Sequence, residues 1–341
     1  MTSVTRRSIL TAGLGAAAAL VPGLGAPAVL AQSGPVTLKL GNNLPPSHSV
    51  NIRLREAVAA IAAETSNGLV ITIFPSNQLG SDSDMMSQLR SGALEMATMP
   101  GTVLSTLIAQ TSLTGLGFTF TDYAKVWAAM DGEVGDHIRR AIEKANLQPF
   151  AAVWDNGFRQ ITTSTKPIHT PADLRGFKIR VPVVPLWVSM FSALGAAPTS
   201  IPLSEAYSAL QTRIADGQEN PLALIDTAKF YEVQKYCSLT NHAWDGFWLL
   251  SGGKVWRTIP ADMQAVMARH LDAAARKQRD DIAKANLDLQ RTIEAKGLVF
   301  NPVDGAPFQA RLKEAGFYKQ WRERFGPEAW GLLQRYAGDV G

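Results

Sequence analysis

The residues with the clearest chemical potential lie between Trp154 and Trp244. Arg180 lies near the end of a predicted strand, residues 177–181. Pro182 ends this strand, because proline lacks the N–H that strand pairing needs. A guanidinium group presents a planar fork of N–H donors that matches the two oxygens of a carboxylate. The strand ends of an open α/β fold are also where such folds bind ligands. Arg180 is therefore a candidate for binding a small carboxylate.

Signatures of catalysis and of metal binding are missing from the sequence. It contains no G-x-S-x-G, H-E-x-x-H or G-x-x-x-x-G-K-[ST] pattern. Cys237 is the only cysteine, which excludes an intrachain disulfide and a cysteine-rich metal site. The five histidines form no H-x-x-x-H pair, so a structural zinc site is not expected. These absences disfavour the common hydrolase and nucleotide-dependent classes of enzyme, and we expect no metal and no cofactor.

Charge and composition exclude further classes of protein. The 341 residues carry 33 Lys and Arg against 29 Asp and Glu, and no basic run exceeds two residues. A nucleic-acid-binding protein would show a basic stripe, so nucleic acid is not an expected partner. A hydrophobic content of 46% with 18% charged residues is typical of a globular chain.

The first 31 residues are typical of an export signal. Arg6 and Arg7 precede a small and apolar stretch, residues 13–30, and Ala31 ends it with a small residue. The paired arginines resemble the twin-arginine type of bacterial signal. A membrane anchor is the alternative, but glycines and prolines interrupt the stretch. We expect cleavage near Ala31, a periplasmic location and a mature chain that is not inserted in the membrane.

The remaining pattern predicts an α/β fold. Apolar periodicity and breakers favour strands at 36–40, 69–74, 95–99, 150–154, 160–163, 177–181, 236–240 and 246–250, and helices at 52–65, 85–91, 124–146, 187–194, 204–214 and 222–229. Ser204 is a candidate cap for the helix at 204–214. Residues 260–296 are helical almost without a breaker. They form either two helices with a bend or one helix that runs across two lobes.

Several motifs in order resemble one family. The matching segments are residues 74–75, 78–80, 154–159, 166–168, 173–182, 194–198, 203–212, 216–221, 230–235 and 240–242. Together they resemble a solute-binding protein of the tripartite ATP-independent periplasmic (TRAP) transporters, of the DctP type. The resemblance implies a two-lobed Venus flytrap fold with a long lobe-spanning helix. It also implies a small organic carboxylate ligand and TRAP membrane permease subunits as partners.

The resemblance also implies the binding residues. Arg180 would pair with the ligand carboxylate through both fork nitrogens, Asn220 would donate to the same group, and Arg159 would add a second cation. Asn220 can alternatively cap the helix that follows it, with Pro221 in the first turn. Further candidates from the same pattern are Asn43, Met99, Asp155, Leu203, His242 and Trp244.

The sequence predicts that the candidate cavity has few hydrogen-bonding side chains. Met99, Pro100 and Leu203 offer little hydrogen bonding, and a hydroxyl buried without a partner costs roughly 1–3 kcal/mol. We therefore expect an acid with an apolar or aromatic body, such as a 2-hydroxy or 2-oxo acid, rather than a sugar acid. Asp155 argues the other way, because its carboxylate can accept from a ligand hydroxyl.

Two other functions remain open at this point. A periplasmic lyase or hydrolase could use Asp155 and His242 as acid and base, and a ligand sensor for a membrane kinase could share the fold. The chain is expected to cross between lobes near Phe158 and Trp244. This division gives lobe 1 as residues 32–157 and 246–285, and lobe 2 as residues 158–245 and 286–341.

Overall fold

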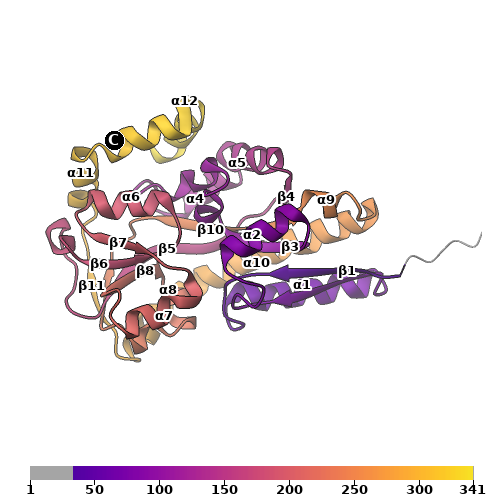
Figure 1. Ribbon diagram of the computed structural model, residues 1–341, viewed down its shortest axis with the longest axis horizontal. Coiled ribbons are helices and arrows are strands. Elements are labelled where there is room, and N and C mark those ends of the chain that lie inside the picture. Colours follow the sequence, from indigo (N-terminus) through magenta and orange to yellow (C-terminus); the bar gives the residue numbers. More distant parts are fainter. Residues whose placement is uncertain (1–33, 341) are drawn as a thin grey trace, which may run out of the picture. The chain divides into compact units, whose positions relative to one another are not determined.

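The computed structural model describes residues 34–340 of the chain. The predicted export signal, residues 1–31 with cleavage after Ala31, lies outside the described residues. Within them, helices surround an eleven-stranded mixed sheet, which confirms the expected α/β class (Figure 1). None of the helices in this part of the chain is long and apolar enough to cross a bilayer.

The strands form two hydrogen-bonded groups, which we call the first sheet and the second sheet. The first sheet contains β1 (Val36–Gly41), β2 (Leu69–Phe74), β3 (Met96–Pro100), β4 (Leu147–Pro149) and β10 (Trp244–Gly252). In it β1 lies between its parallel partners β2 and β3, and β10 pairs antiparallel with both β3 and β4. The second sheet contains β6 (Lys178–Val181), β7 (Ala197–Ser200), β8 (Gly217–Pro221), β9 (Tyr236–Leu239) and β11 (Val299–Pro302). There β6 lies between its parallel partners β7 and β8, and β9 is parallel to β11.

One strand, β5 (Trp154–Thr163), belongs to both sheets. Its first half pairs antiparallel with β10, up to Phe158. From Arg159 onward it pairs with β8 and then also with β9. Gly157 stands at this change of partners with a φ of +119°, which residues with a side chain rarely adopt. β5 is therefore the covalent and hydrogen-bonded link between the two sheets.

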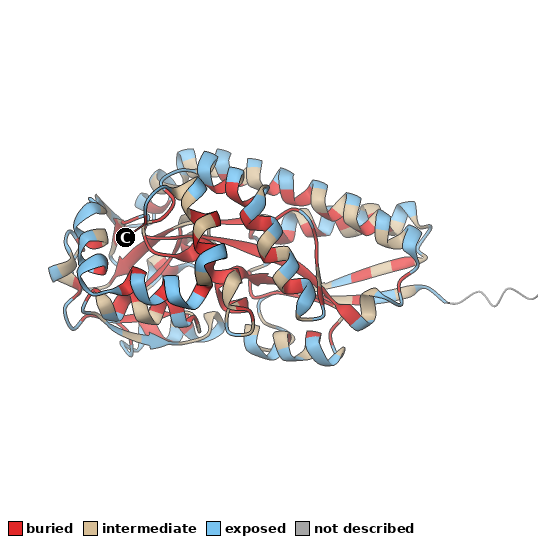
Figure 2. Ribbon diagram, turned by 90° about the horizontal axis from the view of Figure 1, so that it is seen from above, coloured by how far each residue is buried: buried red, intermediate tan, exposed pale blue. Residues whose placement is uncertain are grey.

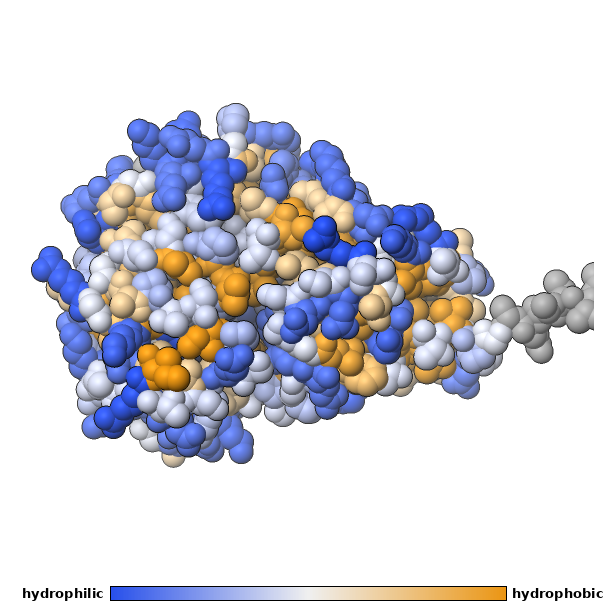
Figure 3. Space-filling model, in the orientation of Figure 1, coloured by the Kyte–Doolittle hydropathy of each residue, from blue (hydrophilic) through white to orange (hydrophobic). Residues whose placement is uncertain are grey.

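Helices cover the faces of the sheets. They are α1 (Ser49–Glu64), α2 (Asp82–Ser91), α3 (Gly101–Leu104), α4 (Tyr123–Met130), α5 (Glu133–Lys144), α6 (Pro185–Ala193), α7 (Leu203–Gln211), α8 (Leu222–Thr227), α9 (Gly253–Trp256), α10 (Ala261–Glu294), α11 (Ala306–Glu314) and α12 (Phe317–Ala337). Short 3-10 turns occupy Ala109–Gly115, Pro171–Leu174 and Phe230–Glu232. The strands are mostly buried, and the helices turn their buried faces inward and their exposed faces to solvent (Figure 2). On the face drawn in Figure 3, apolar residues form separate patches among hydrophilic ones.

The longest helix, α10, is one continuous helix of 34 residues. The alternative of two helices with a bend is therefore wrong. At about 1.5 Å per residue it extends for about 50 Å. It packs against α1 beside the first sheet and against α8 and β11 at the second sheet.

Side chains of α10 also hold β5 in place. Asp272, Gln278 and Arg279 hydrogen bond to backbone groups of residues 152–155. Gln278, which is fully buried, accepts from the N–H of Asp155 at 2.8 Å and donates to its carbonyl at 2.9 Å. The side chains of α10 thus provide hydrogen-bond partners for backbone N–H and carbonyl groups at the start of β5.

Three local predictions were wrong. The sequence pattern predicts two strands, 150–154 and 160–163, with residues 155–158 between them. Residues 155–158 instead lie inside β5, where the positive φ of Gly157 accompanies a change of partner strand. The expected single helix at 124–146 is two helices that break at Gly132, whose Cβ would lie 2.5 Å from the carbonyl of Ala128. Ser204 is not a cap, because α7 begins one residue earlier, after Pro202.

The bonds between Gln278 and β5 generate a test of stability. Gln278→Ala leaves a buried N–H and a buried carbonyl of Asp155 without partners, at roughly 1–3 kcal/mol each. We expect the free energy of unfolding in urea to fall by about 2–4 kcal/mol. Lys277→Ala is the control, since this side chain is exposed on the same turn of α10. Equal stability of the two variants would contradict the role given to Gln278.

Candidate functional site

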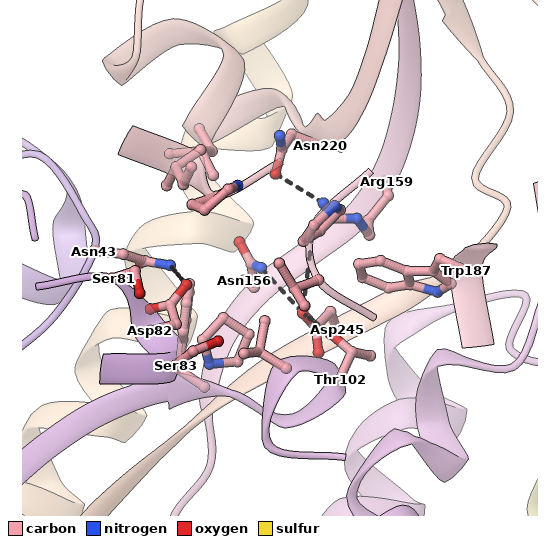
Figure 4. A pocket seen from close by; sticks show the side chains of 18 of the residues that line it. Asn43, Ser81, Asp82, Ser83, Thr102, Asn156, Arg159, Trp187, Asn220 and Asp245 are labelled. Carbon is pink, nitrogen blue, oxygen red and sulfur yellow. Dashed lines mark hydrogen bonds and ion pairs between the residues drawn. The ribbon is translucent and has the colours of Figure 1, made fainter. Parts of the chain in front are cut away.

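A cavity lies between side chains of the two sheets. Figure 4 shows Asn43 and residues 81–83 on one side of it, and Asn220 and Arg159 on the other. The lining residues are Asn43, Ser81, Asp82, Ser83, Pro100, Thr102, Val103, Asn156, Arg159, Arg180, Pro182, Val183, Trp187, Pro202, Leu203, Asn220, Leu224, Asp245 and Phe247.

The wall from the second sheet carries a free cation, Arg180. This residue lies in β6, only 1% exposed, and its Nε donates to the carbonyl of Ile201 at 2.8 Å. Its two terminal nitrogens have no hydrogen-bond partner, and the side chain forms no ion pair, among residues 34–340. Burial lowers the pKa of Arg180 to about 10, so the group is still charged at neutral pH. A buried charge without a partner is costly unless a counter-ion arrives.

The second cation of this wall, Arg159, is already neutralised. Its guanidinium pairs with both carboxylate oxygens of Glu219, and its Nη2 also donates to the Asn220 side-chain oxygen at 2.8 Å. The guanidinium carbon lies 4.3 Å from the centroid of the Trp187 ring. All of these groups are buried. Arg159 is thus a fixed part of the wall, and its charge is balanced before any ligand binds.

His242 supports this ion pair from behind. Its Nε2 lies 3.1 Å from Glu219 Oε2, and its Nδ1 lies 2.8 Å from the Thr240 hydroxyl. Burial holds the pKa of His242 below its ordinary value, which favours the neutral imidazole. Burial alone would raise the pKa of Glu219, but Arg159 and His242 together hold it below its usual range. Glu219 is therefore ionised and bound on both sides.

The wall from the first sheet carries acceptors. Asn43 follows β1 and donates from its Nδ2 to Asp82 Oδ2 at 2.9 Å. Three buried side-chain oxygens have no hydrogen-bond partner among the described residues: the Oδ1 atoms of Asn43, Asp82 and Asn156. Because buried acceptors without donors are costly, they point to a ligand that brings hydroxyl or amine donors.

A second carboxylate on this wall, Asp245 of β10, has its partners within the protein. It accepts from the Thr102 hydroxyl at 3.0 Å and, more weakly, from the Asn156 amide at 3.5 Å. Its Oδ2 lies 3.9 Å from Arg159 Nη1. Burial raises the pKa of Asp245 to about 6, and Arg159 opposes that rise. The cations of the cavity thus come from the second sheet, and the acids from the first sheet or the helix beside it.

Five of the nine predicted site residues line the cavity: Arg180, Arg159, Asn220, Asn43 and Leu203. Asn220 does not cap α8, since it lies in β8, where its side chain accepts from Arg159 and donates to Gln218.

The other four predicted residues lie outside the lining. Met99 is buried in β3, and His242 lies behind Glu219. Trp244 donates its indole N–H to Asp155 at 3.0 Å and packs edge-on against Trp127. The backbone N–H and carbonyl of Asp155 also hydrogen bond to Gln278 of α10. In this structure these four side chains therefore do not line the cavity.

Sequence reasoning missed the acceptor wall. The helix predicted at 85–91 begins at Asp82, and the three residues that it omitted include the acid that lines the cavity. A signal was present, because Ser81 and Asp84 have the spacing of a capping box and form one. Asn156 and Asp245 are not among the predicted site residues, because both lie between the strands that the sequence pattern predicts.

Comparison with known families identifies the architecture. Residues 40–323 match the family model for DctP, bacterial extracellular solute-binding protein, family 7. A solute-binding protein of Roseobacter denitrificans is 34% identical over 88% of this chain and 91% of its own length. The 2,3-diketo-L-gulonate-binding periplasmic protein of Escherichia coli is 31% identical over 76% of this chain and 77% of its own length.

Solved structures agree with the sequence matches. The crystal structure of the Roseobacter TRAP solute-binding protein holds L-galactonate; its TM-score is 0.82, with 30% identity over 89% of this chain and 99% of that one. A TRAP solute-binding protein of Sulfurospirillum deleyianum with bound succinate has a TM-score of 0.83, with 26% identity over 90% of this chain and 100% of that one. These matches confirm the expected two-lobed fold with its long helix.

The expectation of an apolar or aromatic ligand body is not supported. The dry cavity was inferred from Met99, Pro100 and Leu203, but Met99 is not in the lining, and the unpartnered oxygens of Asn43, Asp82 and Asn156 make one wall polar. The bound ligands in the two matched structures are a sugar acid and a dicarboxylic acid.

The buried carboxyl of Asp155 generates a pH-dependent test. Burial raises its pKa to about 7, against the opposing effect of the Trp244 hydrogen bond. The native state then binds a proton more tightly than the unfolded state, so this group's contribution to stability is lost as pH rises from about 4 to 7. In Asp155→Asn that loss is absent.

We therefore expect the variant to gain stability relative to the natural protein as pH rises from 4 to 7, by at most about 1.4 kcal/mol per pH unit, with no further gain above the pKa of about 7. Urea unfolding at several pH values measures the difference. Parallel pH profiles for the two proteins would show that Asp155 does not titrate in this way.

Proposed function

The chain belongs to the bacterial extracellular solute-binding proteins of family 7, the DctP family, and on this premise we propose its ligand and its partner. It captures a small hydroxylated carboxylate in the periplasm and delivers it to the membrane permease subunits of a TRAP transporter. The family consists of binding proteins rather than enzymes, and no chemical step is assigned to the chain.

The observation that carries this proposal is the free fork of Arg180. The two terminal nitrogens of this buried guanidinium have no partner among the described residues, while Arg159 beside it is paired with Glu219. A ligand carboxylate fits the fork with two parallel hydrogen bonds and neutralises the charge. In a closed cavity of low dielectric this pair is stronger than it would be in water.

The opposite wall supports a hydroxylated body for the ligand. The unpartnered oxygens of Asn43, Asp82 and Asn156 can each accept a hydrogen bond, and ligand hydroxyl groups can supply the donors. Apolar lining residues such as Val103 and Phe247 pack against the carbon chain between the two polar ends. Sugar acids of the aldonate and uronate type combine a carboxylate with several hydroxyls, and L-galactonate in the Roseobacter relative is an example.

Capture requires the cavity to open. The polar side chains that face it, including Arg180, Asn156 and Asn220, are buried, so a ligand cannot enter without movement of the walls. We assign residues 32–157 and 246–285 to one lobe, and residues 158–245 and 286–341 to the other. The change of sheet in β5 at Phe158 supports this division, because the two walls then move about the strand that joins them.

The site offers no support for the alternative of a lyase or hydrolase. Asp155 and His242, its candidate acid and base, do not line the cavity, and each has partners within the protein. A sensor for a membrane kinase would use the same cavity. Genes for two permease subunits beside this gene favour transport over sensing.

A thermal-shift panel tests the ligand class. The purified protein is heated with galactonate, galacturonate, phenylpyruvate or galactose, the last of which lacks a carboxylate. A ligand at 100 times its dissociation constant stabilises the native state by about 2.7 kcal/mol. We expect shifts with the sugar acids and none with galactose. A shift with phenylpyruvate alone contradicts the hydroxylated ligand, and a shift with galactose contradicts the need for a carboxylate.

The fork itself is tested by Arg180→Lys, which keeps the charge but loses the paired geometry. We expect the affinity for a sugar acid found in the panel to fall at least tenfold in calorimetric titration, equivalent to about 1.4 kcal/mol. Arg175→Lys is the matched control, since Arg175 is exposed in the same region of the chain. The melting temperature without ligand shows whether each variant is folded, and an unchanged affinity for folded Arg180→Lys would refute the assignment.

A further inference from the structure

We propose that Asp82 makes this cavity selective for acids with a single carboxylate, because the end of the ligand opposite Arg180 meets acceptors and must bring donors. A ligand with a second carboxylate at that end is rejected. This inference rests on the proposed function and narrows its ligand class. It also separates this chain from the matched solute-binding protein that holds succinate, a dicarboxylic acid.

Of the two arginines that line the cavity, one is available to pair with a ligand. Arg159 is held by both oxygens of Glu219, so its charge is already balanced within the wall. Arg180 is in no ion pair with any described residue. One carboxylate of a ligand therefore finds a guanidinium partner, and a second one does not.

Asp82 faces the same cavity and is itself short of partners. Its Oδ2 accepts one hydrogen bond, from Asn43 at 2.9 Å, and its buried Oδ1 accepts none. It forms no ion pair with a Lys or Arg among residues 34–340. Burial raises the pKa of Asp82 to about 6, against the opposing effects of the Asn43 hydrogen bond and of the Arg180 charge, so the carboxyl is largely ionised at pH 7.5. A ligand hydroxyl can donate to the free oxygen, whereas a ligand carboxylate would be repelled by it.

The other polar groups of this wall do not offset that repulsion. Asp245 adds a second negative charge, and the amide nitrogens of Asn156 and Asn43 already donate to Asp245 and Asp82. Their free atoms are the Oδ1 acceptors. The Ser83 hydroxyl can donate or accept and so does not discriminate.

The N-terminus of α2, which meets the cavity at residues 81–83, is not a free anion site. Ser81 and Asp84 close a capping box, in which Asp84 accepts from the Ser81 N–H and Ser81 accepts from the Asp84 N–H. Asp82 and Asp84 both lie in the first turn, where acidic side chains offset the positive end of the helix dipole. The helix supplies its own anions, so it does not attract a carboxylate of the ligand.

A matched pair of acids tests the proposal directly. Galactarate is galactonate with its C6 hydroxyl group oxidised to a carboxylate, and either enantiomer of galactonate gives the same galactarate. Calorimetric titrations at pH 7.5 compare the two acids, and gluconate and glucarate form a second pair. We expect the monocarboxylate to bind at least tenfold more tightly than the dicarboxylate. Equal affinities would overturn the selectivity while leaving the proposed function intact, and no binding of any of the four acids would count against both.

Two variants assign the selectivity to one side chain. Asp82→Asn keeps an oxygen for Asn43 and places an amide donor where the free carboxylate oxygen lies. We expect it to bring the affinity ratio of the pair below threefold, mainly by tighter binding of the dicarboxylate. Asp84→Asn removes the same charge from the same turn, but this exposed residue does not line the cavity, so its ratio should stay above tenfold. An unchanged ratio in Asp82→Asn, or an equal loss of selectivity in both variants, would refute the role of Asp82.

Discussion

The pairing of Arg159 with Glu219 is the interaction on which the cavity depends. It lies on β5 immediately after the strand leaves the first sheet, and it fixes Asn220 and Trp187 around one buried guanidinium. Breaking such a pair leaves an uncompensated charge at a cost of about 3–5 kcal/mol. Because this pair consumes one of the two cations, Arg180 is the only one left to meet a ligand. One arginine of the cavity is therefore neutralised within the protein, and the other has no ion-pair partner among the described residues.

The separation of charge between the walls follows from the topology. Strand ends and turns of the second sheet bring Arg180 and Asn220 to the cavity, while β10 and the start of α2 bring Asp245 and Asp82. A ligand of the proposed kind, with a negative end and a donor end, would complete both walls at once. A ligand that satisfied one wall alone would leave buried polar groups unpaired on the other. The proposed specificity and the proposed closure would follow from the same arrangement.

The sequence predicted the fold class and the cation wall better than the acceptor wall. Arg180 could be placed because Pro182 marks the end of its strand, and because the surrounding motifs follow one another in a family-like order. Asp82 could not, because the predicted helix began three residues late. Asn156 was not predicted, because the sequence pattern places it between two strands, whereas it lies within one continuous strand, β5. Polar residues that act through tertiary contacts, such as Gln278, leave no periodic signal at all.

The position of β5 among its partners has a consequence for the order of folding. Its contacts join residues 54 to 62 positions apart with β8, from Thr163 with Gly217 to Arg159 with Pro221, and 123 positions apart with α10. Long chain loops must close before such contacts repay the entropy that they cost, so this strand is expected to assemble late and slowly. Both walls of the cavity include residues of β5 or of strands that pair with it. A nascent chain would then become able to hold the proposed ligand only after these long-range pairings have formed.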